Sequence, residues 1–188
     1  MSDERFKLPA HEDMTPEQRR LADAIVAGPR GSLRGPFPVY LHSPEMGQRA
    51  QHLGAYVRFE SVLPAKLREL AILLVARHWT AQYEWYAHRE MALKADLDPA
   101  IVDAIAARKR PERLDRDEAA IYDFAYQLLE TKQVSDAAFA ALRDAVGTQG
   151  VVDVIGTLGY YGLVSMTLNV NRSALPPGVA PLPPLGPR

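Results

Sequence analysis

Two glutamates and one histidine are the side chains in this sequence best suited to proton transfer. Glu84 and His88 are four residues apart, so on a helix they share one face, about 40° apart around the axis. Glu69 lies on a preceding apolar stretch, and a turn between two helices could bring it beside the pair. A carboxylate next to an imidazole can exchange protons with a substrate. The sequence therefore predicts a general acid–base site formed by these three residues.

Aromatic and imidazole side chains are predicted to surround this site and bind a substrate. The candidate substrate-binding residues are His42, Tyr83, Trp85, Tyr160 and Tyr161. Each also has a purely structural interpretation, because buried tyrosines and tryptophans commonly pack in a core with their polar atoms satisfied. Glu84 and His88 could likewise form a helix-surface pair worth a few tenths of a kcal/mol. Glu69 could instead pair with Arg68 or Arg77.

Composition excludes several classes of function. The 188-residue chain contains no cysteine, which rules out disulfides, thiolate metal sites and thiol-based redox chemistry. A net charge of −1 gives no indication of a surface for nucleic acid or anionic membranes. We therefore expect a small-molecule substrate and neither nucleic acid nor membrane as a partner.

No stretch of the sequence is predicted to direct the chain into a membrane. The most apolar run, 151–170, is interrupted by Asp153 and by glycines. The N-terminus, MSDERFKLPAHED, is charged and lacks the apolar core of a signal peptide. A cytoplasmic location is the expectation.

The apolar pattern predicts an all-α domain of about seven or eight helices. Helical periodicity recurs along the chain and no useful stretch alternates with the period of a strand. Helix starts are marked by N-cap residues such as Thr15, Thr80, Asp115 and Ser135. We predict a flexible polar leader over residues 1–14, a single domain over 15–174 and an extended proline-rich tail over 175–188.

Two glycine-rich stretches have more than one structural interpretation. GPRGSLRGPFP, from Gly28 to Pro38, cannot form regular structure and could be a lid, an oligomer arm or a surface connector. In the last predicted helix Gly156, Gly159 and Gly162 recur every third residue, although each glycine costs about 1 kcal/mol of helix propensity. A close contact with another helix or another subunit would explain them.

Three motifs together resemble a known family. Arg68-Glu69-Leu70 on an apolar helix precedes Tyr83-Glu84-Trp85-x-x-His88, and GYYGLVSMTLN follows near the C-terminus. From Tyr40 to Arg172 the sequence resembles the carboxymuconolactone decarboxylase-like, AhpD-like superfamily. The resemblance implies an all-α AhpD-like bundle that assembles as a homo-trimer or hexamer. It also implies that Glu69 and His88 occupy the positions of a catalytic glutamate and histidine.

The sequence departs from the peroxidase branch of that family at the most important positions. Alkyl hydroperoxidases carry a Cys-x-x-Cys pair where this chain has Ala81 and Glu84. Without thiols, peroxide reduction by that route is impossible, so we expect no thiol peroxidase activity. The decarboxylase branch requires neither cysteine nor cofactor. The resemblance therefore favours a cofactor-free lyase that decarboxylates or isomerises a small lactone or carboxylic acid.

Two other classes remain open at this point. Glu69, Glu84 and His88 resemble a carboxylate–histidine set that could hold iron, manganese or zinc. Alternatively, the chain could be a non-catalytic oligomeric protein that retains the fold. Our first expectation is an acid–base site without a metal.

Overall fold

The computed structural model describes residues 3–184; residues 1–2 of the predicted leader and 185–188 of the predicted tail lie outside the described residues. Within that range the chain forms α-helices and no β-strand, which confirms the all-α prediction. The helices are α1 (Pro16–Ala27), α2 (Phe37–Tyr40), α3 (Pro44–Ala55), α4 (Ala65–His78), α5 (Gln82–Lys94), α6 (Pro99–Ala106), α7 (Arg116–Thr131) and α8 (Asp136–Asn171). Two single turns complete the set, the 3-10 turn η1 (His11–Asp13) and the π-helical turn η2 (Tyr56–Glu60).

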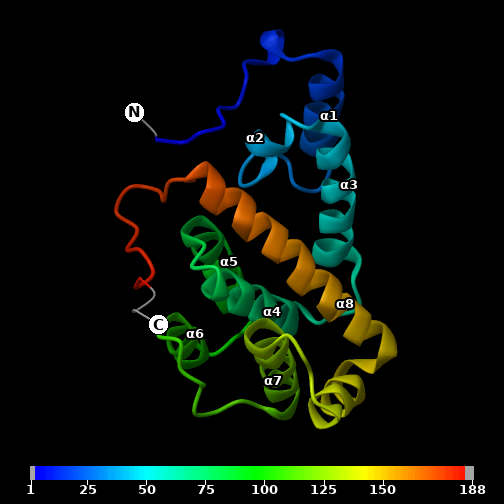
Figure 1. The fold of residues 1–188 in the computed structure, drawn as a ribbon, viewed down its shortest axis with the longest axis vertical. Helices are drawn as coiled ribbons and strands as arrows, with labels where there is room; N and C mark the ends of the chain where they lie inside the picture. The colour runs from blue at the N-terminus through cyan, green and yellow to red at the C-terminus, as the bar shows by residue number, and fades with distance from the viewer. Residues whose placement is uncertain (1–2, 185–188) are drawn as a thin grey trace.

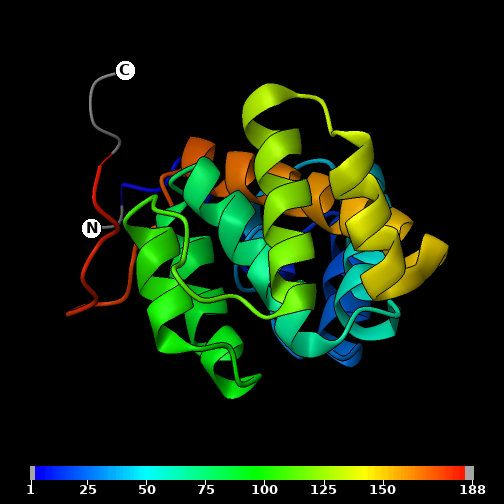
Figure 2. The same ribbon diagram turned by 90° about the horizontal axis from the view of Figure 1, so that it is seen from below.

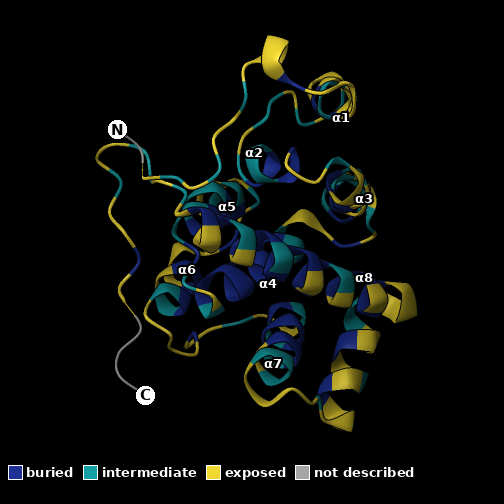
Figure 3. Ribbon diagram, turned by 45° about the horizontal axis from the view of Figure 1, so that its top comes forward, coloured by how far each residue is buried: buried dark blue, intermediate teal, exposed yellow. Residues whose placement is uncertain are grey.

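Helix α4 is the centre of the fold. Every residue from Leu67 to Arg77 except Arg68 is buried, and Figure 3 shows the helix as the dark centre of the molecule. It packs against α5, α7 and α8. Figure 1 shows α8 crossing the molecule, with α1 and α3 on one side and α5 to α7 on the other, and Figure 2 gives the view of the same helices from below. A helix that is apolar on nearly all faces is stable only when it is surrounded in this way.

Local capping signals fix where the helices begin. Thr15 and Gln18 form a capping box at the start of α1, and Asp115 and Glu118 form another at the start of α7. Each box satisfies two backbone N–H groups that would otherwise lack partners. Ser135 caps α8 through the backbone N–H of Ala138. These three predicted helix starts are confirmed.

Helix α8 joins two segments that the sequence predicts as separate helices. The break is at Gly147, whose φ of 73° is a left-handed conformation that glycine adopts without steric cost. By length and composition alone α8 could cross a membrane, but 61% of its most apolar window is buried inside the fold. That burial is typical of the core helix of a soluble domain.

The three regularly spaced glycines of α8 do not mediate a close helix contact within the chain. A Cβ atom at Gly156 or Gly162 would find its nearest neighbours at 3.7 Å, and one at Gly159 would find none within 4 Å. The intrachain form of the prediction is therefore wrong, because there is room for side chains at these positions. A contact with another subunit stays a prediction.

Both terminal segments contact the helices. The backbone N–H of Phe6 donates to Oδ1 of Asn171 at the end of α8 (2.8 Å). Near the other end, the side chain of Gln82 accepts from the backbone N–H of Leu182 (2.7 Å) and donates to its carbonyl (3.3 Å). The Leu182 side chain is buried in the main core. The tail is extended, and these contacts hold it beside the start of α5 (Figure 1).

Candidate active site

Glu69 and His88 form a buried pair between α4 and α5. Nδ1 of His88 donates a hydrogen bond to Oε2 of Glu69 at 2.6 Å, and both side chains are buried. The other carboxylate oxygen of Glu69 lies 4.0 Å from Nε of Arg68. The carboxylate thus fixes the orientation of the imidazole ring, and Arg68 supports its charge.

Glu84 completes a row of three ionisable groups. Its Oε1 lies 3.0 Å from Nε2 of His88, one helical turn away on α5. Glu84 is the third residue of α5, so the helix dipole favours its anionic form. The structure therefore brings Glu69, His88 and Glu84 together in that order, as the sequence predicts.

The surroundings of His88 favour its protonated form. Burial lowers the pKa of the imidazole, but the charge of Glu84 and the hydrogen bond to Glu69 raise it by a larger amount. The net effect is a rise of the His88 pKa from 6.5 to about 9. The ring also meets the edge of Tyr161, with 4.9 Å between the ring centroids. Burial raises the pKa of the Tyr161 hydroxyl well above its ordinary value, and the nearby Glu84 adds to that effect. At neutral pH the site therefore holds an imidazolium beside a neutral tyrosine.

A cavity of about 310 Å³ adjoins this row of charges. That volume is at the lower end of the range typical of small-molecule sites. Glu84 and His88 both line it. Residues from the α1–α2 loop, α2, η2, α5 and α8 complete the wall, namely Arg30, Ser32, Arg34, Gly35, Pro36, Phe37, Arg58, Tyr83, Tyr86, Ala87, Glu90, Met91, Tyr160, Tyr161 and Val164.

The candidate substrate-binding residues divide into two groups. Tyr83, Tyr160 and Tyr161 line the cavity. Trp85 and His42 do not, so these two placements need correction. Trp85 follows Glu84 by one residue, which turns it about 100° around α5 and into the main core. The His42 ring packs at a tilt against Phe6, with 5.3 Å between the ring centroids, and contacts the carbonyl of Lys7 on the outside of the molecule.

The start of α5 also differs from the prediction. The N-cap residue is Ala81, and Thr80 adopts a left-handed conformation with a φ of 48°. The Thr80 hydroxyl accepts a hydrogen bond from Nη1 of Arg77 at 2.9 Å instead of capping the helix. The turn between α4 and α5 is therefore one residue longer than the capping pattern predicts, while Glu84 still falls in the first turn of α5.

Sequence reasoning missed the arginines of the cavity. Arg30 and Arg34 come from the loop that follows α1, and Arg58 comes from η2. The only signal in the sequence is that the predicted loop carries both Arg30 and Arg34. The structure shows that this loop reaches the acid–base residues. It ends in the short helix α2, which begins at Phe37, earlier than the loop was predicted to end.

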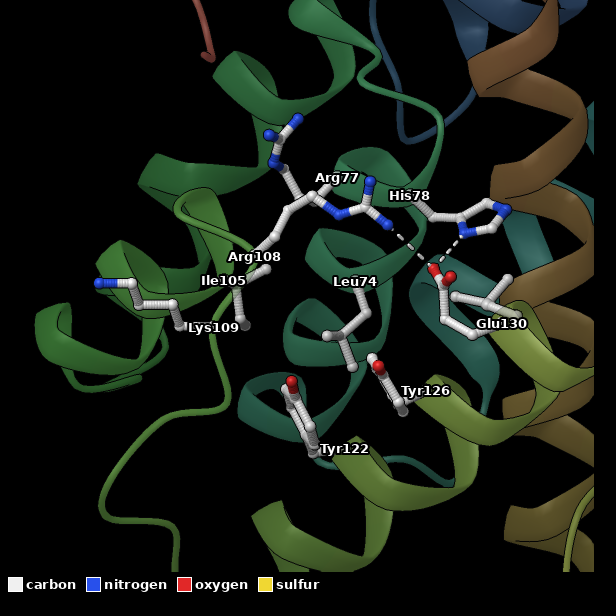
Figure 4. Close-up of a pocket in the computed structure, with 10 residues that line it drawn as sticks. Leu74, Arg77, His78, Ile105, Arg108, Lys109, Tyr122, Tyr126 and Glu130 are labelled. Atoms are coloured by element: carbon white, nitrogen blue, oxygen red, sulfur yellow. Dashed lines mark hydrogen bonds and ion pairs between the residues drawn. The ribbon is translucent and has the colours of Figure 1, made fainter. Parts of the chain in front are cut away.

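A second, smaller cavity of about 90 Å³ lies between α4, α6 and α7. Figure 4 shows its polar side, where His78 and Arg108 both approach the carboxylate of Glu130. The distances to Glu130 Oε1 are 2.9 Å from Nδ1 of His78 and 3.3 Å from Nη2 of Arg108. Tyr122 and Tyr126 form another part of its wall.

The donor atoms of the main site are engaged with one another. Both ring nitrogens of His88 face carboxylates, so neither has a free lone pair for a metal ion. Over residues 3–184 no group of three or more His, Asp or Glu side chains has an arrangement that could hold a metal. The three side chains form a buried carboxylate–imidazole–carboxylate row.

Two solved structures that share this architecture are described as AhpD-like proteins. An uncharacterised peroxidase-related protein from Ralstonia eutropha, described as an alkylhydroperoxidase AhpD core, matches with a TM-score of 0.73 over 93% of both chains, at 18% sequence identity. A protein of unknown function from Agrobacterium tumefaciens, proposed to be an antioxidant defence protein of the AhpD type, matches with a TM-score of 0.64 at 16% identity. That match covers 76% of this chain and 99% of the other.

Sequence comparisons add nothing to this assignment, because neither models of known protein families nor curated protein sequences give a match. At such identities the structural similarity establishes the fold alone. The chain therefore has the AhpD-like fold, which confirms the predicted fold class.

Proposed function

We propose that this protein is a cofactor-free acid–base enzyme that decarboxylates or isomerises a small lactone or carboxylic acid. The observation that supports this proposal is the row Glu69–His88–Glu84 at the wall of a cavity of about 310 Å³. Proton transfer by positioned side chains contributes about 10²–10⁴-fold to a reaction rate. A buried carboxylate–imidazole–carboxylate row can transfer protons in this way. It contains no thiol and therefore cannot carry out thiol chemistry.

The proposed roles follow from position. Glu84 and His88 line the cavity and form the acid–base pair, whereas Glu69 does not line it and orients His88. In decarboxylation, the bond to the departing carboxylate breaks and its electron pair forms an enolate as carbon dioxide leaves. The enolate carbon then takes a proton from the Glu84–His88 pair, and solvent restores that proton. In isomerisation, Glu84 removes a proton from one carbon and the pair returns it to another.

The enzyme is proposed to act in the cytoplasm as a homo-trimer or hexamer, with no nucleic acid or membrane partner. The feature that supports assembly is a row of exposed apolar residues along α8, namely Val152, Ile155, Met166 and Val170. At 100° of rotation per residue these four positions fall within about 60° of one another around the helix axis, which places them on one face. Light scattering should give the mass of three or six chains; a monomer at micromolar concentration would contradict assembly.

Substitution of the acid–base pair tests the proposed chemistry. Carbon dioxide release and ultraviolet absorbance are measured with a panel of unsaturated lactone acids and β-keto acids. We expect the wild type to turn over at least one compound, and Glu84→Gln and His88→Gln each to reduce the rate about 10²-fold or more. The matched control is Glu130→Gln, which changes a carboxylate in the second cavity and should leave turnover intact.

Full activity in the double variant Glu84→Gln/His88→Gln would refute the proposal. Metal analysis of untagged protein separates the nearest alternative, because a stoichiometric metal that is required for turnover would replace acid–base catalysis by a metal mechanism.

A further inference from the structure

Arg30 has an unusual environment for an arginine near the surface. Its Cζ lies 5.0 Å from the ring centroid of Phe37 and 5.8 Å from that of Phe59, so the guanidinium is held by two aromatic rings. Its Nε and Nη2 atoms are inaccessible to solvent, and neither has a hydrogen-bond partner of good geometry among the described residues. The Tyr160 hydroxyl is the nearest candidate partner, since Arg30 opposes the rise in the pKa of Tyr160 that burial causes. Buried donors of this kind are rare and costly unless a partner is present.

The surrounding backbone leaves space for this guanidinium. Gly54 lies beside it, and a Cβ atom there would come within 2.6 Å of Nη2 of Arg30 and would overlap Tyr160. Even alanine is therefore excluded at this position while Arg30 and Tyr160 keep their places. Tyr160, like Arg30, lines the cavity that Glu84 and His88 line.

Arg58 is brought to the same cavity by the π-helical turn η2. Asp153 fixes this turn, since its carboxylate accepts from the Tyr56 hydroxyl and from the backbone N–H of Val62, both at 3.0 Å. Nη2 of Arg58 donates a hydrogen bond to Sδ of Met91 at 3.3 Å. A thioether is a weak acceptor, so this donor is available to a stronger one. Turns of this type recur at functional sites.

The charges of the wall favour an anion in this part of the cavity. Three arginines line it, Arg30, Arg34 and Arg58, against the two carboxylates of Glu84 and Glu90. His88 adds a further positive charge to the wall. Of its two carboxylate partners, Glu84 lines the cavity and Glu69 does not. A guanidinium presents its donors in a planar fork that matches a carboxylate better than any neutral group.

We propose that Arg30, assisted by Arg58, binds a carboxylate of the substrate and holds the substrate against the Glu84–His88 pair. The inference rests on the proposed function, to which it adds a positioning residue that determines specificity for anions. It also gives the α1–α2 loop a role, since the loop supplies the residue that orients the substrate.

Calorimetric titration with maleate tests this inference without turnover. Maleate should bind the wild type, and maleamide, its uncharged analogue, should bind at least about tenfold more weakly. Arg30→Met keeps an apolar stem between the two rings but removes the fork, and should weaken maleate binding about tenfold or more. The matched control is Arg20→Met, which removes an exposed arginine of α1 paired with Glu17 and should leave maleate affinity unchanged.

Several outcomes would overturn the inference: no maleate binding to folded wild type, equal affinity for maleamide, equal affinity for inorganic phosphate, or unchanged maleate affinity in Arg30→Met. The thermal unfolding of each variant is compared with that of the wild type to confirm that it is folded.

The same proteins separate this inference from the proposed function. With a substrate in hand, Arg30→Met should raise KM more than it lowers kcat, and turnover with an unchanged KM would overturn the role of Arg30 alone. Maleate binding that depends on Arg30, in a wild type that turns over none of the panel, would support the inference and count against the proposed chemistry alone.

Discussion

Two histidine–glutamate pairs each take one residue from α4. They share the same kind of hydrogen bond but differ in how far they are exposed to solvent. His88 contacts Glu69 at 2.6 Å, and the two side chains are 4% and 5% exposed. His78 contacts Glu130 at 2.9 Å, and those side chains are 21% and 34% exposed. Both glutamates accept from an Nδ1 atom. The difference between the pairs is therefore their access to water.

Position on α4 explains that difference. Glu69 lies among the buried residues of the helix, where a charge is stable only with a partner. His78 is the last residue of α4, where the helix dipole favours a cation and water competes for every hydrogen bond. The first pair also has a second carboxylate, Glu84, and a larger cavity beside it. The second has Arg108, which makes it part of a surface ion network (Figure 4).

Removal of Glu69 should have the largest effect on stability. Glu69→Ala leaves an imidazolium buried with one partner lost, and breaking a buried pair costs about 3–5 kcal/mol. We expect the free energy of unfolding, measured by urea denaturation, to fall by that amount. Glu69→Gln, which keeps an acceptor for Nδ1 of His88, should recover part of the loss. A decrease below about 1 kcal/mol for Glu69→Ala would place this pair in the class of surface ion pairs.

The pH dependence of stability should also distinguish the buried pair. Because the pKa of His88 is raised from 6.5 to about 9, the folded chain holds this proton more tightly than the unfolded chain does. The stabilisation is complete below pH 6.5 and is lost as the pH rises through 9. Over that window we expect the free energy of unfolding to fall by up to about 3 kcal/mol.

Urea denaturation of the wild type and His88→Gln at about pH 6 and about pH 9.5 measures this dependence. The wild type should lose stability between the two conditions, and the variant should lose much less. Equal losses in both proteins would mean that other groups cause the dependence.

The fold was predictable because the signals that define it are local. The capping boxes that begin at Thr15 and Asp115 and the apolar run of α4 each depend on residues close together in the sequence. The spacing of Glu84 and His88 is of the same kind, since four residues on a helix determine a shared face. The juxtaposition of Glu69 with this pair also needed the family resemblance, because a turn between two helices does not by itself determine which residues meet.

The rest of the site depends on contacts between distant parts of the chain. Arg30 reaches the cavity because Gly54 leaves space for it, and Arg58 does so because Asp153 fixes the η2 turn. No local pattern reports either contact. Trp85 shows that closeness in sequence to site residues is also an unreliable guide. Its sequence neighbours line the cavity, but its own position around α5 directs it into the core.

Substitution of His78 should have the smallest effect. Its hydrogen bond keeps the pKa of Glu130 below the ordinary value of 4.5, so the contribution of this pair is present above that pH and is lost as the pH falls through the lowered pKa. Exposed pairs of this kind are worth about 0–1 kcal/mol. His78→Ala should therefore reduce the free energy of unfolding by less than about 1 kcal/mol at neutral pH, and added salt should shrink the difference further. The two pairs then lose their contributions at opposite ends of the pH scale, the exposed pair in acid and the buried pair in base. A cost for His78→Ala equal to that of Glu69→Ala, or a loss of turnover in that variant, would show that exposure does not separate the two pairs.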